Sequence, residues 1–134
     1  MDAAMREIFP SRKVMVLGMD RKRIVEKRYQ AAGCQVIRAT DTAAAMDLAR
    51  HQIFDTAVLL SQGSFVNIAE AVFNLRDLNQ GLEIIVLVDR QAKNPSRFFR
   101  RLLENPIERT KIMTRRQLQK YLQVASSIAD APER

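Results

Sequence analysis

Polar side chains that could bind a cation or a phosphate group follow three apolar runs of the sequence. Asp20 lies three residues after one run, Ser61 directly follows a second, and Asp89 directly follows a third. Carboxylate and hydroxyl oxygens are the ligands that Mg²⁺ and Ca²⁺ prefer in proteins. Two carboxylates and one hydroxyl make a sparse ligand set, so we favour ordinary loop residues. Asp20 and Asp89 are the metal ligands to consider if a site exists.

The segment from Ser61 to Ser64 could bind an anion through its backbone N–H groups ahead of a helix. Its sequence, Ser-Gln-Gly-Ser, lacks the repeated glycines and the lysine of a phosphate-binding loop. A turn that caps a helix is therefore the favoured interpretation. The single cysteine, Cys34, excludes an internal disulfide, and the single histidine, His51, excludes a His-rich metal site. We expect no cofactor and no catalytic residue.

The elements that would position these residues alternate between strands and helices. Four apolar runs and a fifth, less apolar one predict strands at 13–17, 35–39, 56–60, 83–88 and 109–113. Helical spacing of apolar residues is found at 24–32, 42–49, 65–75, 99–103 and 118–125. Gly33 is placed to end the first helix, while Thr42 and Thr114 are placed to cap two others. The order predicts an α/β fold, a flavodoxin-like doubly wound five-stranded parallel sheet with helices on both faces.

The length of 134 residues fits a single domain. We expect an N-terminal extension over 1–11, the folded domain over 12–128 and a flexible C-terminal tail over 129–134. No apolar run approaches the roughly 18 residues of a membrane span. The N-terminus lacks the apolar stretch of a signal peptide. The sequence therefore predicts a cytoplasmic protein that makes no membrane contact.

Positive charge is concentrated in one part of the chain. Residues 90–120 hold ten basic and two acidic side chains, a net charge of +8, whereas the whole chain carries +7. The candidate partner surface within this segment consists of Arg97, Arg100, Arg101, Arg109, Arg115, Arg116 and Lys120. We expect it to bind an acidic protein or a second copy of the chain. Nucleic acid is a less favoured partner, because no helix-turn-helix, zinc finger or ribonucleoprotein motif accompanies the charge.

Five segments give the chain a resemblance to the receiver domain of response regulators, the CheY-like family, over roughly residues 12–124. The likeness lies in the hydrophobic pattern and spacing of 13–17, 32–39, 43–49, 54–60 and 84–88. In that family, two acidic residues after the first strand hold Mg²⁺ and an Asp ending the third strand accepts a phosphoryl group. A Thr or Ser ends the fourth strand and a Lys ends the fifth. The cation and the Lys offset the charge of the phosphoryl group, and the hydroxyl senses it.

The sequence lacks these side chains at the matching positions, and no residue from Ala57 to Ser64 is acidic. The matching residues are Gly18 and Met19 for the acidic pair, Leu60 (or Ser61, if the register shifts by one) for the acceptor, Val88 for the hydroxyl and Met113 for the lysine. The resemblance therefore implies a degenerate member, a pseudo-receiver, without an aspartyl-phosphate switch.

These observations lead to a hypothesis of a stand-alone, non-enzymatic module of bacterial signalling. It would act by protein contacts through the basic 90–120 segment, which a receiver fold would place on its fourth helix, fifth strand and fifth helix. Two alternatives stay open. One is an anion- or nucleic-acid-binding module that uses the same segment, and the other is a small ligand-binding or enzymatic α/β domain that uses the loops at the sheet edge. The apolar Leu60 and Val88 at that edge argue against a polar pocket there.

Overall fold

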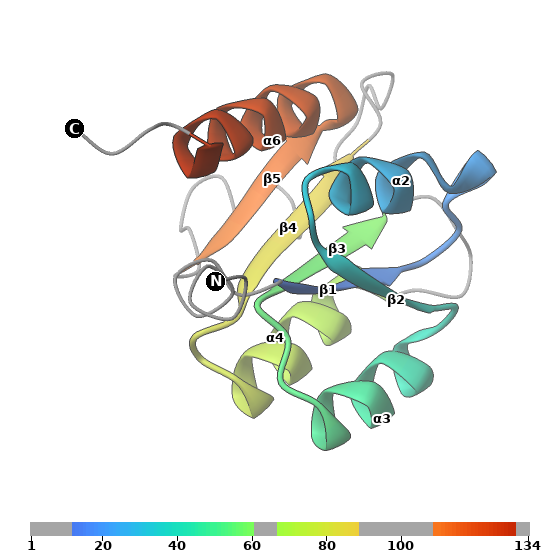
Figure 1. The fold of residues 1–134 in the computed structure, drawn as a ribbon. Coiled ribbons are helices and arrows are strands. Elements are labelled where there is room, and N and C mark those ends of the chain that lie inside the picture. Colours follow the sequence, from blue (N-terminus) through green and yellow to red (C-terminus); the bar gives the residue numbers. More distant parts are fainter. Residues whose placement is uncertain (1–11, 61–66, 89–108, 131–134) are drawn as a thin grey trace.

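The computed structural model describes residues 12–60, 67–88 and 109–130 of the chain, in which strands and helices alternate as far as β4 (Figure 1). The elements in chain order are β1 (Lys13–Leu17), the 3₁₀ helix η1 (Arg21–Arg23), α2 (Ile24–Ala31), β2 (Gln35–Ala39), α3 (Thr42–His51), β3 (Thr56–Leu60), α4 (Ile68–Leu78), β4 (Glu83–Val88), β5 (Thr110–Thr114) and α6 (Arg115–Asp130). The first four strands have the predicted bounds. β5 begins and ends one residue later than predicted.

The five strands form one parallel sheet in the order β2-β1-β3-β4-β5. β1 pairs with β2 on one side and with β3 on the other, so the chain adds strands first in one direction and then in the opposite one. This order is the doubly wound, flavodoxin-like arrangement that the alternation of elements predicts. β2 lies at an edge of the sheet, which explains why its residues are more polar and more exposed than those of β3.

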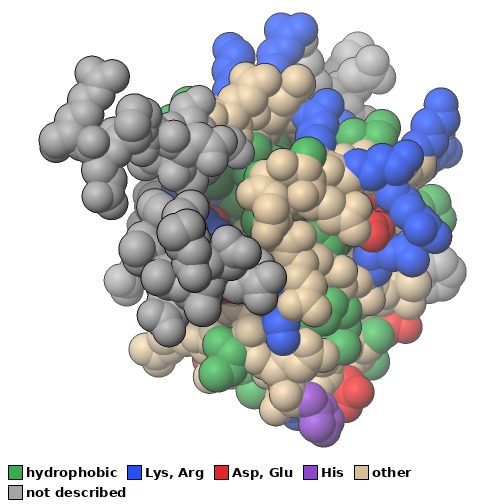
Figure 2. Space-filling model, in the orientation of Figure 1, with side chains coloured by type: hydrophobic (Ala, Val, Ile, Leu, Met, Phe, Trp, Pro, Cys, Tyr) green, Lys and Arg blue, Asp and Glu red, His purple; other side chains and the backbone are tan. Residues whose placement is uncertain are grey.

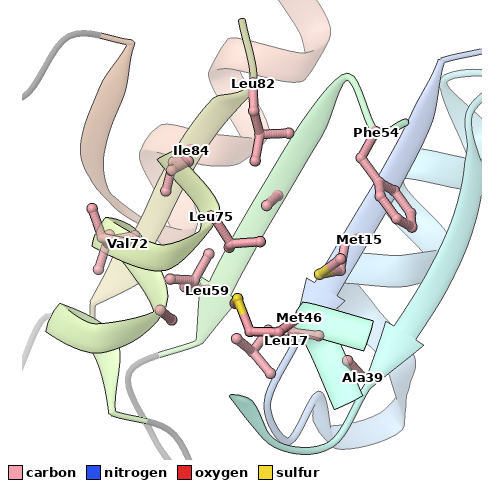
Figure 3. Packing of buried hydrophobic residues seen from close by; sticks show 14 residues of the cluster. Met15, Leu17, Ala39, Met46, Phe54, Leu59, Val72, Leu75, Leu82 and Ile84 are labelled. Carbon is pink, nitrogen blue, oxygen red and sulfur yellow. The ribbon is translucent and has the colours of Figure 1, made fainter. Parts of the chain in front are cut away.

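α3 and α4 cover one face of the sheet (Figure 1), where alternate residues of the strands form a closely packed apolar cluster. Met15 and Leu17 of β1 and Leu59 of β3 belong to this cluster together with Met46 of α3 and Leu75 of α4 (Figure 3). Every second strand residue faces this cluster, because successive side chains of a strand point to opposite faces of the sheet. α3 and α4 are thereby fixed to the sheet by apolar contact.

α2 and α6 cover the opposite face (Figure 1), where the remaining strand residues form a second cluster. Its buried members are Val14, Val16, Val25, Tyr29, Val58, Leu60, Ile85, Leu87 and Leu118. Leu118 is the buried anchor of α6, and Tyr121 and Leu122 pack beside it, as the helical spacing predicts. The two clusters together make β1, β3 and β4 buried on both faces, which explains their continuous apolar sequences.

The ends of two helices match the expected sequence signals. Gly33 adopts φ +89°, and its N–H donates to the Gln30 carbonyl at 3.0 Å while the Cys34 N–H donates to the Tyr29 carbonyl at 3.0 Å. This pair of bonds is the Schellman motif, which needs a residue with positive φ and so favours glycine. Thr114 caps α6, because its hydroxyl accepts from the Gln117 N–H at 3.2 Å.

The prediction that Thr42 caps a helix is wrong by one residue. Asp41 is the cap of α3, since its Oδ1 accepts a hydrogen bond from the Ala44 N–H at 2.8 Å. A carboxylate at this place also interacts favourably with the positive end of the helix dipole. The segments expected at 1–11 and 99–103, and residues 131–134 of the expected tail, lie outside the described residues. No helix in the part of the chain that the structure describes is long and apolar enough to span a membrane.

Candidate functional site at the carboxyl edge of the sheet

The residues that match the receiver positions come together at the carboxyl ends of the strands. Gly18 directly follows β1, and strand pairing aligns Leu60 with Leu87. Val88 and Thr114 are aligned at the ends of β4 and β5. This is the edge at which ligands bind in doubly wound sheets. The residues singled out from the sequence therefore lie at one edge of the sheet, and the chemistry of that edge follows from the individual side chains.

Leu60, the residue that the sequence resemblance matches to the phosphoryl acceptor, is a core residue. Its side chain is 2% exposed and belongs to the cluster beneath α2 and α6, together with Leu87 and Leu118. An apolar side chain packed in this way offers neither a nucleophile nor a cation ligand. Ser61, the acceptor in the alternative register, lies outside the described residues.

Gly18 closes the same edge from the side of β1. It adopts φ +115°, and its N–H donates to the Ala39 carbonyl at 2.9 Å. A Cβ atom added at Gly18 would lie 3.0 Å from the Leu60 Cβ and 3.2 Å from the Leu60 carbonyl oxygen. Both the backbone conformation and this close approach require glycine. Gly18, which the sequence resemblance matches to the first acidic residue, therefore has no room for a side chain.

The remaining positions at the start of α2 do not form a metal site either. Met19 is 63% exposed and carries a thioether in place of a carboxylate. Asp20 uses both oxygens to cap α2, because Oδ1 accepts from the Val25 N–H at 3.1 Å and Oδ2 accepts from the Glu26 N–H at 2.9 Å. In residues 12–60, 67–88 and 109–130 no group of three or more His, Cys, Asp or Glu side chains could hold a metal ion. The residues described at this edge do not fit Mg²⁺, which prefers carboxylate oxygens. Asp89 lies outside the described residues.

The lysine position is also occupied by residues with other contacts. Met113 packs against the cluster beneath α2 and α6. Thr114 and Gln117 form reciprocal bonds at the start of α6, since the Thr114 N–H donates to the Gln117 Oε1 at 2.9 Å. This arrangement is a capping box. Neither Met113 nor Thr114 supplies a positive charge to the edge.

Lys111, the lysine of β5, reaches toward the opposite end of the sheet. Its Nζ lies 3.5 Å from Oε2 of Glu83, the first residue of β4, and 4.7 Å from the centroid of the Tyr121 ring. An ion pair and a cation–π contact together hold the ammonium group there. Both contacts hold the Lys111 ammonium group at the amino edge of the sheet, away from Leu60.

Glu83 is the centre of a polar cluster that the sequence reasoning missed. The Tyr121 hydroxyl donates to its Oε2 at 2.5 Å, and the Thr56 hydroxyl donates to its Oε1 at 3.2 Å. Burial, the hydrogen bond to Glu83 and its negative charge raise the pKa of Tyr121 to about 12. Burial and then the Glu83 charge raise the pKa of Tyr29 as well. The cluster ties α6 to β3, β4 and β5, and its only sequence signal is a Glu at the start of an apolar strand.

The expected basic surface is only partly described. Arg97, Arg100 and Arg101 lie outside the described residues. Arg109 precedes β5 at the amino edge of the sheet, and a strand rising about 3.3 Å per residue separates it from Arg115 by about 20 Å. Arg116 and Lys120 are exposed and lie one turn apart on α6. We call Arg115, Arg116 and Lys120 the α6 basic face.

Two residues of the α6 basic face lie where the helix dipole disfavours positive charge. Arg115 and Arg116 are the first two residues of α6, and the first turn of the helix holds no acidic residue. Cations at a helix N-terminus are unfavourable, so these residues do not contribute to helix stability. Figure 2 shows Lys and Arg side chains gathered over α6 and around η1 and α2, with fewer over α3 and α4.

Cys34 is a half-buried thiol that follows the Schellman turn. Burial raises its pKa, with a smaller lowering by the nearby charge of Arg12. A raised pKa disfavours the thiolate, which is the reactive form of cysteine. The surroundings of Cys34 therefore favour an unreactive thiol.

The solved structures to which this chain is similar include receiver domains of response regulators. No protein-family model matches the sequence, and no curated protein matches it. A response regulator receiver protein from Sinorhizobium medicae aligns with TM-score 0.67 and 13% identity, covering 90% of this chain and 95% of that one. The receiver domain of a Pseudomonas aeruginosa sensor histidine kinase, with magnesium in its active-site cleft, aligns with TM-score 0.67 and 14% identity over 88% and 96%. The chemotaxis response regulator CheY4 of Vibrio cholerae aligns with TM-score 0.66 and 16% identity over 89% and 98%. The chain therefore has the fold of a CheY-like receiver domain.

Proposed function

We propose that this protein is a receiver-type signalling module that works without an aspartyl-phosphate switch. In this proposal it is a pseudo-receiver, and it acts by contact with other proteins. It has no catalytic role of its own. The fold of receiver domains supports the signalling role, and the residues at the carboxyl edge support the loss of the switch.

The contact between Gly18 and Leu60 carries the proposal. A phosphoryl acceptor needs a carboxylate that is open to solvent and next to a bound cation. Leu60 is buried instead, and a Cβ at Gly18 would approach its Cβ to 3.0 Å. Where the resemblance would place the first acidic residue and the acceptor, the chain has Gly18 and Leu60, which pack against each other.

The other replacements support the same conclusion independently. Val88 has no hydroxyl with which to sense a phosphoryl group, and Lys111 is paired with Glu83 at 3.5 Å. Because Lys111 interacts with Glu83 and Tyr121 at the amino edge, it does not offset charge at the carboxyl edge. Shifting the match to the receiver positions by one residue would not restore the acidic pair, the acceptor, the hydroxyl and the lysine together.

The partner in this proposal is an acidic protein surface that binds the α6 basic face. Arg116 and Lys120 are exposed on one side of the helix, and Arg115 adds a third charge at its start. Complementary charge raises association rates and selects partners. A homodimer through the same face is the second form of this proposal. Binding to nucleic acid is the alternative that the charge alone also permits.

We expect the double substitution Arg116→Glu and Lys120→Glu to abolish capture of the partner from a lysate of the native host. Arg50→Glu is a matched control, because Arg50 is an exposed cation on α3, on the other face of the sheet. Affinity capture with wild-type protein and both variants, followed by mass spectrometry, measures the effect.

Sedimentation over a range of concentrations tests the homodimer. The proposal is wrong if the captured proteins are the same for all three proteins and no dimer forms. It is also wrong if duplex DNA binds with a steep salt dependence.

A further inference from the structure

The turn between β1 and α2 joins exposed apolar side chains to uncompensated positive charge. Met19 is 63% exposed and Ile24 is 39% exposed. Between them stand three consecutive exposed cations, Arg21, Lys22 and Arg23. We call these five residues, together with Lys27, the β1–α2 surface.

The acidic residues of this segment do not neutralise its charge. Asp20 directs both carboxylate oxygens to the N–H groups of Val25 and Glu26, at 3.1 and 2.9 Å. Glu26 forms an ion pair with Arg38 of β2, whose Nε lies 3.3 Å from its Oε1.

None of the four cations of the β1–α2 surface has an ion-pair partner among the residues that the structure describes. The helix dipole also disfavours positive charge at the start of α2. Their presence there does not serve the stability of the fold.

We propose that the β1–α2 surface binds an acidic, amphipathic segment of a partner protein. Carboxylates of the segment would pair with Arg21, Lys22, Arg23 and Lys27, and its apolar side chains would cover Met19 and Ile24. Methionine adapts well to such contacts, because its unbranched thioether side chain is flexible. This proposal does not depend on the α6 basic face.

An acidic protein fits this surface better than a nucleic acid does. Phosphate groups would satisfy the cations but would leave Met19 and Ile24 uncovered. Single-stranded nucleic acids bind by stacking bases on aromatic side chains, and residues 19–27 contain no aromatic residue. Exposed cations next to exposed apolar side chains therefore favour a partner that carries both carboxylates and apolar side chains.

Two synthetic peptides test the proposal with the intact protein. One has Glu and Leu at helical spacing, and the matched control has Ser in place of every Leu. We expect the Glu/Leu peptide to bind at least about tenfold more tightly than the Glu/Ser peptide, because covering Met19 and Ile24 contributes apolar burial. Fluorescence anisotropy at physiological salt gives the affinities. Two-dimensional ¹⁵N NMR should show the largest shifts at the amides of residues 19–27.

Variants of the protein locate the binding surface. Lys22 and Arg23 have φ of 57° and 54°, so Lys22→Gly with Arg23→Gly removes two charges and suits the left-handed backbone. We expect this variant, and also Met19→Ser, to weaken Glu/Leu peptide binding by about tenfold. Arg50→Glu changes the net charge by the same two units on α3, on the other face of the sheet from α2, so it is the matched control and should bind nearly as well as the wild type. Equal affinity for both peptides, equal loss in the control variant, or tighter binding of a DNA duplex would overturn the proposal.

Discussion

Replacing Leu60 with aspartate, the side chain that a receiver phosphorylates, is expected to destabilise the protein by about 5 kcal/mol. Leu60 is 2% exposed in the cluster beneath α2 and α6, so the substitution removes its apolar contacts. It also places a carboxyl group among Leu87, Leu118 and their neighbours. Equilibrium unfolding in urea measures the loss. Because burial raises the pKa of a carboxyl group, the stability difference from the wild type should shrink as the pH is lowered.

Two control substitutions separate burial from the loss of a particular residue. Leu60→Met keeps the volume and the apolar character, and we expect it to cost less than about 1.5 kcal/mol. Met19→Asp introduces a carboxylate at the other, exposed receiver position, and its effect should stay within about 0.5 kcal/mol. If Leu60→Asp costs less than about 1 kcal/mol, the acceptor position is open to solvent and the packed edge described above does not exist.

Replacing Gly18 with alanine is expected to cost about 3 kcal/mol of the free energy of unfolding, from two sources. The first is the φ of +115°, which non-glycine residues rarely adopt. The second is the approach of the new Cβ to the Cβ and the carbonyl oxygen of Leu60, at 3.0 and 3.2 Å. No change of side-chain rotamer moves these two atoms, so the strands themselves must shift. Thermal and urea unfolding measure the effect.

Gly33 supplies the matched control for Gly18. It also has positive φ, at +89°, but a Cβ added there meets no atom within 4 Å. Gly33→Ala should therefore cost only the backbone strain, about 1 kcal/mol. The difference between the two substitutions isolates the contact between β1 and β3. Equal losses at the two positions would mean that Gly18 is required by its backbone alone.

Most of the fold can be predicted from the sequence because its strands are short, continuous apolar runs. Such runs at 56–60 and 83–88 suit strands that are buried on both faces, and helices of amphipathic spacing separate them. The limits of β5 are harder to predict, since Lys111 and Thr110 interrupt the apolar pattern. The start of α2 is also not predictable. Lys22 and Arg23 adopt positive φ there without the Gly or Asn that usually marks such a turn.

The sequence is enough to predict which residues lie at the candidate site, but it does not predict the contacts that they make. The alternation of strands and helices is enough to bring Gly18, Leu60 and Val88 to one edge. The contact between Gly18 and Leu60 depends on how the ends of β1 and β3 approach each other. It cannot be predicted from the sequence around either residue. The pairing of Lys111 with Glu83 likewise depends on the direction that a long side chain takes along its strand. Both contacts join residues that are far apart in the sequence.

The central claim is that the carboxyl edge of this receiver fold does not accept a phosphoryl group. Wild-type protein incubated with acetyl phosphate and Mg²⁺, beside an active receiver as positive control, tests it by intact-mass spectrometry. Two-dimensional ¹⁵N NMR with beryllofluoride and Mg²⁺ tests binding of a phosphoryl mimic at the same edge. We predict an unchanged mass and unchanged amide signals at Gly18, Leu60 and Val88. A mass gain of one phosphoryl group, or shifts of these amides with beryllofluoride, would contradict the account.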